Sequence, residues 1–240
     1  DLQHHPVGLV ARLAEGVDDL EPLGDLLALG VGGRLLHLLA QLLGKGVDVD
    51  LPQQGQDRLP AHAGGEGLLA ELLASEGYPA GRRGIVITNA CGFAVFASDY
   101  AELYGIDLVD LSPETLSALS AFLPPAWSHG NPLDLVGDSG VEQYARVFDF
   151  LIKHQEFWDI GFIVSVPDAV LDPTQLSQEV VRFSRNTKKM VVGCFLGGSS
   201  VASSVQILRA HHIPNFADLE DAFRVVGRAC RLKRPRGTEP

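Results

Sequence analysis

The chain has 240 residues, a net charge of −11, 46% hydrophobic residues and three cysteines. The acidic balance argues against nonspecific binding to nucleic acid, because such binding depends on Lys and Arg side chains that neutralise phosphates. The cysteines lie too far apart in the sequence to form a metal-binding motif or an evident disulfide framework, so a reducing cytoplasm is expected, and no apolar run reaches the length of a membrane span.

Residues 1–74 differ in composition from the rest of the chain. They contain Leu, Gly, Ala, Val, Asp, Glu, Gln, His, Pro and Arg, with Lys45 as the one exception, and the missing residue types all appear from Ser75 onward. Each of these ten types can be encoded by a codon that begins with G or C, as happens when the opposite strand of a GC-rich gene is read in register. Two interpretations stay open, a translation artefact and a helical or poorly ordered arm.

From about Gly67 the chain alternates between helical patterns and short apolar runs, and Ser112 and Asp218 are typical N-cap residues at two of the helix starts. In chain order, the expected elements are a helix over 68–74, a strand over 84–88, a helix over 92–103 ended by Gly105, a strand over 106–109, a helix from Ser112 to the prolines at 124 and 125, a polar turn over 127–138, a helix over 141–154, a strand over 160–166, a helix over 172–185, a strand over 190–196, a turn over 197–200 followed by a helix to His211, a strand over 213–216 and a helix over 218–232.

This alternation predicts right-handed crossovers and a doubly wound, mostly parallel, flavodoxin-like sheet over residues 75–232. The strands are apolar on both faces, as a sheet covered by helices on both sides requires. Residues 233–240 have few apolar side chains and are expected to be a disordered tail.

The turn after the first strand is the main candidate site. It contains Thr88, Asn89, Ala90, Cys91 and Gly92, and a helix follows it directly. In an open parallel sheet ligands bind at the carboxyl ends of the strands, and the free amides and dipole of a helix N-terminus favour an anion such as phosphate. The turn contains no Gly-x-Gly-x-x-Gly or Gly-Lys-Ser/Thr motif, so dinucleotide-binding and P-loop chemistry are excluded.

Three further features of the sequence could support a site. Asn131, Asp134 and Gly137 lie in the polar turn over 127–138, where side chains that only stabilise the loop are as good an explanation as ligand contact. Gly197 and Gly198 could cradle an anion in a second turn. Cys91 could act as a nucleophile with His129 as its base, although a small thiol that fills the turn is the better explanation. No metal site is predicted.

Two motifs resemble those of the NDP-forming acyl-CoA synthetases, the succinyl-CoA synthetase-like family that includes ADP-forming acetate–CoA ligase. They are Thr88-Asn89-Ala90-Cys91-Gly92, after an Arg-Arg-Gly-Ile-Val-Ile strand, and Asn131-Pro132-Leu133-Asp134-Leu135 with the following Val-Gly-Asp. The resemblance covers roughly residues 67–232 and is to the second of the family's two flavodoxin-like CoA-ligase domains.

The resemblance implies a partial enzyme. Family members couple acyl-CoA thioester chemistry to ATP or ADP through an acyl phosphate and a phosphohistidine, and each flavodoxin-like domain points a helix N-terminus at that phosphohistidine. Here the matching helix would begin at Cys91 and Gly92. The CoA-binding, phosphohistidine and ATP-grasp domains have no counterpart in this chain, so they are its expected partners. ATP or ADP, CoA and Mg²⁺ would be used by the complete enzyme, and none is expected to bind firmly here.

The sequence also departs from the family pattern. The family usually has Gly, Pro and Gly where this chain has Cys91, Phe93 and Ala94, and extra Cβ atoms narrow the approach of the backbone to phosphate. A non-catalytic regulatory or interaction domain with the same fold is therefore the second hypothesis.

Overall fold

A computed structural model describes residues 65–232 of the chain. The predictions for the tail at 233–240 and for nearly all of the unusual segment at 1–74 lie outside these residues. Within the described part, no helix has the length and apolar character needed to cross a membrane.

The sheet is five-stranded and parallel. Its strands are β1 (Arg83–Thr88), β2 (Asp107–Leu108), β3 (Leu133–Asp134), β4 (Ile160–Ser165) and β5 (Met190–Phe195). The order β2-β1-β4-β5 is that of a flavodoxin-like sheet, and Asn215 extends it by a single bridge to Gly193. The doubly wound α/β fold predicted from the sequence is therefore confirmed.

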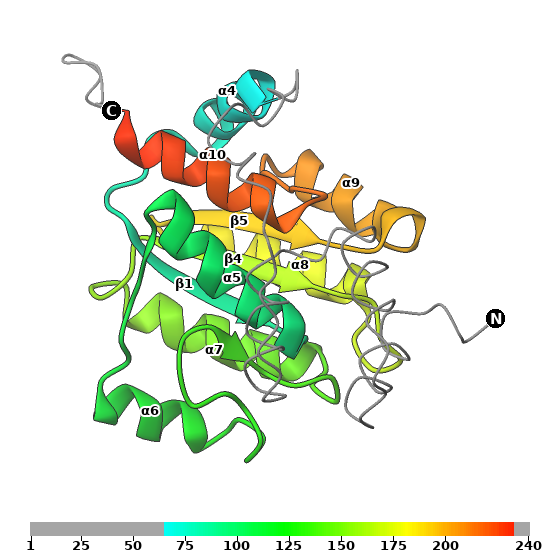
Figure 1. The fold of residues 1–240 in the computed structure, drawn as a ribbon. Coiled ribbons are helices and arrows are strands. Elements are labelled where there is room, and N and C mark those ends of the chain that lie inside the picture. Colours follow the sequence, from blue (N-terminus) through cyan, green and yellow to red (C-terminus); the bar gives the residue numbers. More distant parts are fainter. Residues whose placement is uncertain (1–64, 233–240) are drawn as a thin grey trace, which may run out of the picture. The chain divides into compact units, whose positions relative to one another are not determined.

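Helices cover both faces of this sheet (Figure 1). They are α4 (Gly65–Glu76), α5 (Cys91–Tyr104), α6 (Pro113–Ser120), α7 (Val141–Lys153), α8 (Pro173–Arg185), the short 3₁₀ helix η2 (Gly198–Val201), α9 (Ala202–Ala210) and α10 (Leu219–Arg231). The expected N-caps are present, because the side chains of Ser112 and Asp218 accept amide hydrogen bonds at the starts of α6 and α10. Asp172 caps α8 in the same way, and Gly105 ends α5 with a φ of 74°.

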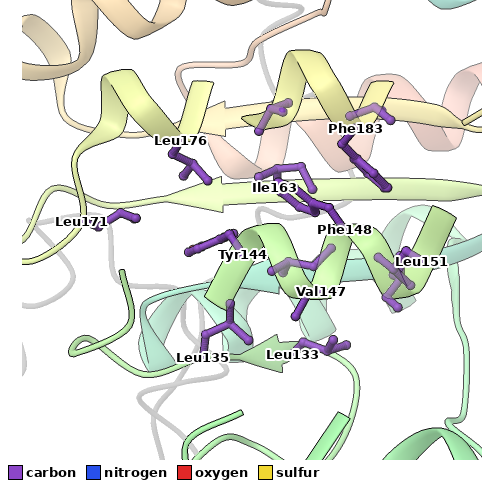
Figure 2. Close-up of a cluster of buried hydrophobic side chains, with 14 of the residues drawn as sticks. Leu133, Leu135, Tyr144, Val147, Phe148, Leu151, Ile163, Leu171, Leu176 and Phe183 are labelled. Carbon is purple, nitrogen blue, oxygen red and sulfur yellow. The ribbon is translucent and has the colours of Figure 1, made fainter. Parts of the chain in front are cut away.

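Two apolar cores lie on the two faces of the sheet. On one face α4, α5 and α10 pack against side chains such as Val86 and Phe162, and the Phe162 ring stacks on Phe223 with centroids 4.2 Å apart. On the other face α7, α8 and α9 pack around a cluster that includes Phe148 and Phe183, whose rings stack 4.6 Å apart (Figure 2). Burial on both faces explains why the strand sequences are almost continuously apolar.

Several elements differ from the sequence prediction. The strand expected over 213–216 is reduced to the single bridge of Asn215. The strand β3 lies inside the segment expected to be a polar turn, where it pairs with the last two residues of β1. Helix α6 ends at Ser120 rather than at the prolines. Helix α4 crosses the composition break at residue 74, and its Leu69 and Leu72 side chains are buried in the core beside α10. Partners that are distant in sequence account for β3, which pairs with β1, and for α4, which packs against α10.

The carboxyl group of Glu76 gives the domain a predicted pH dependence. Burial raises its pKa to about 7, although the Val191 N–H donates to its Oε2 atom at 3.3 Å and opposes that rise. The folded state therefore holds this proton more tightly than the unfolded state, so stability falls as the pH rises from about 4.5 to about 7 and then levels off. For a partly exposed group the loss should be about 2 kcal/mol.

Glu76→Gln should remove this loss, because Gln keeps an acceptor for the Val191 amide and carries no charge. Urea unfolding should show the variant more stable than the natural chain at pH 8 and equal to it at pH 4.5. Glu71→Gln, on the exposed face of the same helix, is the matched control. An equal gain from the control at pH 8 would show that overall charge, not burial of Glu76, causes the effect.

Candidate functional site at the carboxyl edge of the sheet

The 88–92 turn, which joins β1 to α5, is built by two buried polar side chains. The hydroxyl of Thr88 accepts a hydrogen bond from the Ala90 amide at 3.1 Å, and the Thr88 side chain is fully buried. Asn89 is 4% exposed, and its amide donates to the Val166 carbonyl at 2.8 Å while its oxygen accepts from the Val166 amide at 3.0 Å. Both side chains are therefore engaged by protein atoms and fix the shape of the turn.

Helix α5 begins with two amides free to bind a ligand. Ala90 is its N-cap and provides no side-chain cap, while its carbonyl accepts from Phe93 at 3.0 Å and Ala94 at 3.1 Å. Among the residues described, no acceptor is found for the amides of Cys91 and Gly92. Both residues are exposed, and a Cβ atom added at Gly92 would meet no atom within 4 Å. These two amides and the helix dipole make an anion the favoured ligand at this position.

The bulky residue that departs from the family pattern lies along the helix. The Phe93 ring is half-buried and stands 6.3 Å from the Phe96 ring, in a row that continues to Tyr100. Phe93 packs against the core shared by α5 and α10. The Phe93 ring thus contacts Phe96 and this core, and Cys91 is the exposed substitution in the first turn of α5.

Asn131 is part of the sheet. Its side-chain oxygen accepts from the Val86 amide at 3.0 Å, and its side-chain amide donates to the Gly84 carbonyl at 2.9 Å and to the Val109 carbonyl at 3.2 Å. It thereby fills the gap between β2, which pairs with the start of β1, and β3, which pairs with its end. The predicted supporting loop therefore pairs with β1, the strand that leads into the 88–92 turn.

Asp134 and Gly137 also lie beside this turn. Asp134 pairs with Thr88 in the sheet, is 7% exposed, and accepts from the Val136 amide at 3.0 Å through Oδ1. A Cβ atom on Gly137 would be 3.9 Å from the Asn89 carbonyl oxygen. A cleft of about 270 Å³ runs between this segment and the first turns of α5, and the residues that line it include Cys91, Val95, Ser98, Ser128 and Asp134.

His129 is engaged elsewhere. Its Nε2 atom lies 3.1 Å from the Pro125 carbonyl oxygen, its Nδ1 atom lies 3.5 Å from the Ser120 hydroxyl, and its ring packs on Trp127. No hydrogen bond joins it to Cys91 in the part of the chain that the structure describes. This arrangement favours Cys91 as a turn residue over a Cys–His nucleophile.

The second turn also lies at the carboxyl edge of the sheet. Gly197 and Gly198 have φ values of 154° and 58°, and a Cβ atom on Gly197 would be 2.5 Å from Cγ of Pro167. Helix α9, which follows this second turn, packs beside α8 on the face of the sheet opposite α5. The two turns therefore begin helices in different layers, and the segment after β4 lies between them.

Asp168, in that segment, was not predicted from the sequence. Its Oδ2 atom accepts from the Asn89 side-chain amide at 2.6 Å, and its Oδ1 atom accepts from the amides of Val170 and Leu171 at 2.8 and 2.7 Å. Burial opposes ionisation, but these three hydrogen bonds hold its pKa below the usual range. Sequence reasoning missed Asp168 because its partner Asn89 is 79 residues away.

The comparisons with known proteins agree with the motifs. The family model described as the Ligase-CoA domain matches residues 84–238. The chain belongs to this Ligase-CoA domain family. The site described above lies inside the matched region, and within residues 65–232 no group of three or more His, Cys, Asp or Glu side chains could hold a metal ion.

Curated relatives of this Ligase-CoA domain chain are much longer proteins. It is 34% identical over 150 residues to acetate–CoA ligase (ADP-forming) I of Archaeoglobus fulgidus, which covers 61% of this chain and 21% of the relative. It is 30% identical over 159 residues to the alpha subunit of acetate–CoA ligase (ADP-forming) I of Pyrococcus furiosus, covering 65% of this chain and 34% of the subunit. The chain thus spans a fifth to a third of these relatives.

Solved structures show the same fold. The dinucleotide-forming acetyl-coenzyme A synthetase 1 of Ca. Korarchaeum cryptofilum, in complex with phosphate and ADP, matches with a TM-score of 0.64 and 20% identity, covering 95% of this chain and 45% of that one. PH0766 of Pyrococcus horikoshii matches with a TM-score of 0.63 and 22% identity, covering 83% of this chain and 45% of that one. These two structures show the fold, and the 34% identical Archaeoglobus relative shows homology to part of an ADP-forming acetate–CoA ligase.

Proposed function

We propose that the chain is a fragment or subunit of an NDP-forming acyl-CoA synthetase and provides the phosphate-facing turn of its second flavodoxin-like domain. The observation that carries the proposal is the pair of acceptor-free amides at Cys91 and Gly92, which open a 14-residue helix at the carboxyl edge of the sheet. Those amides and the helix dipole would stabilise the phosphoryl group of a phosphohistidine carried by another domain.

The role of this chain is to bind and orient the phosphoryl group rather than to react with it. Thr88 and Asn89 fix the turn, while Cys91 and Gly92 donate to phosphoryl oxygens. The nucleophilic histidine, the CoA site and the nucleotide site belong to the missing domains or subunits, and Mg²⁺ would accompany the nucleotide there. Homologues that are several times longer than the matched segment support this division of labour.

A second candidate function is a non-catalytic regulatory or interaction domain. The observation that favours it is the exposed Cys91 side chain at the first position of α5, where a Cβ atom stands beside the two free amides. In that case the fold would be retained without phosphoryl contact.

A domain exchange separates the two candidates. Residues 65–232 would replace the homologous segment of the Archaeoglobus acetate–CoA ligase, and acetyl-CoA-dependent ATP formation and phosphoenzyme labelling would be measured. We expect the chimera to form phosphoenzyme and ATP, and the isolated chain to form neither, since it lacks the histidine. A chimera that folds and binds ADP but forms no phosphoenzyme would favour the regulatory domain, and turnover by the isolated chain would contradict the fragment proposal.

A further inference from the structure

The segment that follows β4 contacts both predicted turns. Val166 forms two hydrogen bonds with the Asn89 side chain, so that Asn89 continues the pairing of β1 with β4 beyond the ends of the strands. Pro167 lies against Gly197 so closely that a Cβ atom there would clash with its ring. The conformation of this segment therefore affects the 88–92 turn directly.

Asp168 completes the hydrogen bonding of Asn89. One Nδ2 hydrogen of Asn89 goes to the Val166 carbonyl, and the second goes to Oδ2 of Asp168 at 2.6 Å. The other Asp168 oxygen receives the Val170 and Leu171 amides. A carboxylate suits this position because it is an acceptor on both sides, and all three of its partners are donors. Asn89 is thereby held in one orientation, two residues before the first free amide of α5.

We propose that Asp168 is a positioning residue of the phosphate-facing turn. By fixing Asn89, it keeps the 88–92 turn in the conformation in which the Cys91 and Gly92 amides point together at an anion. This inference rests on the proposed function and adds to it a residue outside both family motifs. Asp168 itself touches no phosphate, because its oxygens are occupied by Asn89, Val170 and Leu171.

A through-space charge effect of Asp168 and a positioning role of Asp168 predict opposite changes in anion binding when the residue is replaced. If the negative charge of Asp168 acted on an anion at α5 only through space, its removal would strengthen anion binding. If Asp168 positions the turn, its removal should weaken binding. Asp168→Asn is the suitable variant, since an Asn has one donor and one acceptor side and cannot accept from Asn89 and from the Val170 and Leu171 amides at once.

Asp172→Asn is the matched control. Asp172 lies on the same segment and loses the same charge, but it caps α8 through the Thr174 and Gln175 amides and has no contact with Asn89. Asn is also a good N-cap residue, so the control should keep the fold. Urea midpoints of the two variants would verify that both chains are folded under the conditions of binding.

In the test, inorganic phosphate is titrated into the full chain, and binding is followed by the NMR chemical shifts of the Cys91 and Gly92 amides. We expect phosphate to shift both amides in the natural chain and in Asp172→Asn. Asp168→Asn should bind about three- to ten-fold more weakly. Hydrogen exchange should be faster than in the control at the Ala90 amide, which donates to Thr88, and at the Val166 amide, which donates to Asn89.

Each outcome has one meaning. Equal or tighter phosphate binding by Asp168→Asn overturns the positioning role, because the charge effect then dominates. If phosphate shifts neither amide in the natural chain, the phosphate-facing turn of the proposed function fails, and hydrogen exchange then decides the present inference alone. Faster exchange at the Ala90 and Val166 amides in Asp168→Asn than in Asp172→Asn would still support positioning of the turn by Asp168, and unchanged exchange would overturn it.

Discussion

Gly92→Asp should reduce phosphoenzyme formation in the assembled enzyme by about 100-fold, the usual effect of losing one well-placed donor to a developing anion. The new carboxylate would lie beside the amides of Cys91 and Gly92, where it would compete with a phosphoryl group for the same donors and repel it. The fold should be unaffected or slightly more stable, because the position is open and an acidic side chain in the first turn of a helix is favourable.

The chimera that carries residues 65–232 provides the measurement, and Gly92→Ala provides the control. Alanine adds a Cβ atom in the same open space without charge, so it should lower phosphoenzyme formation only a few-fold. Thermal unfolding of all three proteins would separate activity from folding. Full activity in a correctly folded Gly92→Asp chimera would show that the amides of this turn face no phosphoryl group in the reaction.

Much of the architecture could be predicted because it depends on local chemistry. The β1 run, the Ser112 and Asp218 caps and the Gly105 helix end each act within a few residues of themselves. The position of the candidate turn follows equally locally, since an apolar strand that runs into a helix places the turn at the carboxyl edge.

The remaining features depend on partners that are distant in sequence. Leu133 and Asp134 form a strand because the end of β1, 46 residues earlier in the chain, offers pairing positions that β2 leaves free. Asn131 binds Val86 between the two paired regions. Asn131 therefore had the sequence appearance of a loop residue and the structural role of a strand residue. The contribution of Asp168 could not be predicted, because nothing near it in the sequence identifies Asn89 as its partner.

Helices α5 and α10 approach each other so closely that Gly→Ala should destabilise the domain in α10, although the same substitution should stabilise it in α4. Gly227 lies in α10, and a Cβ atom there would overlap the Tyr104 carbonyl oxygen and come within 3.1 Å of the Tyr104 Cβ atom. The obstacle is largely backbone, so it cannot rotate away. Gly227→Ala should therefore destabilise the domain by about 3 kcal/mol, in spite of the better helix propensity of alanine.

Gly67→Ala tests the effect of helix propensity on the free energy of unfolding, without a steric clash. Gly67 lies in α4, where a Cβ atom meets nothing within 4 Å, so alanine should stabilise the domain by about 0.5 kcal/mol. Urea unfolding of the natural chain and the two variants at one pH gives both values. If Gly227→Ala were as stable as the natural chain, α10 would have to be able to move away from α5. The packing of Phe223 against Phe162 and Tyr100 would then contribute less to the fold than their contacts indicate.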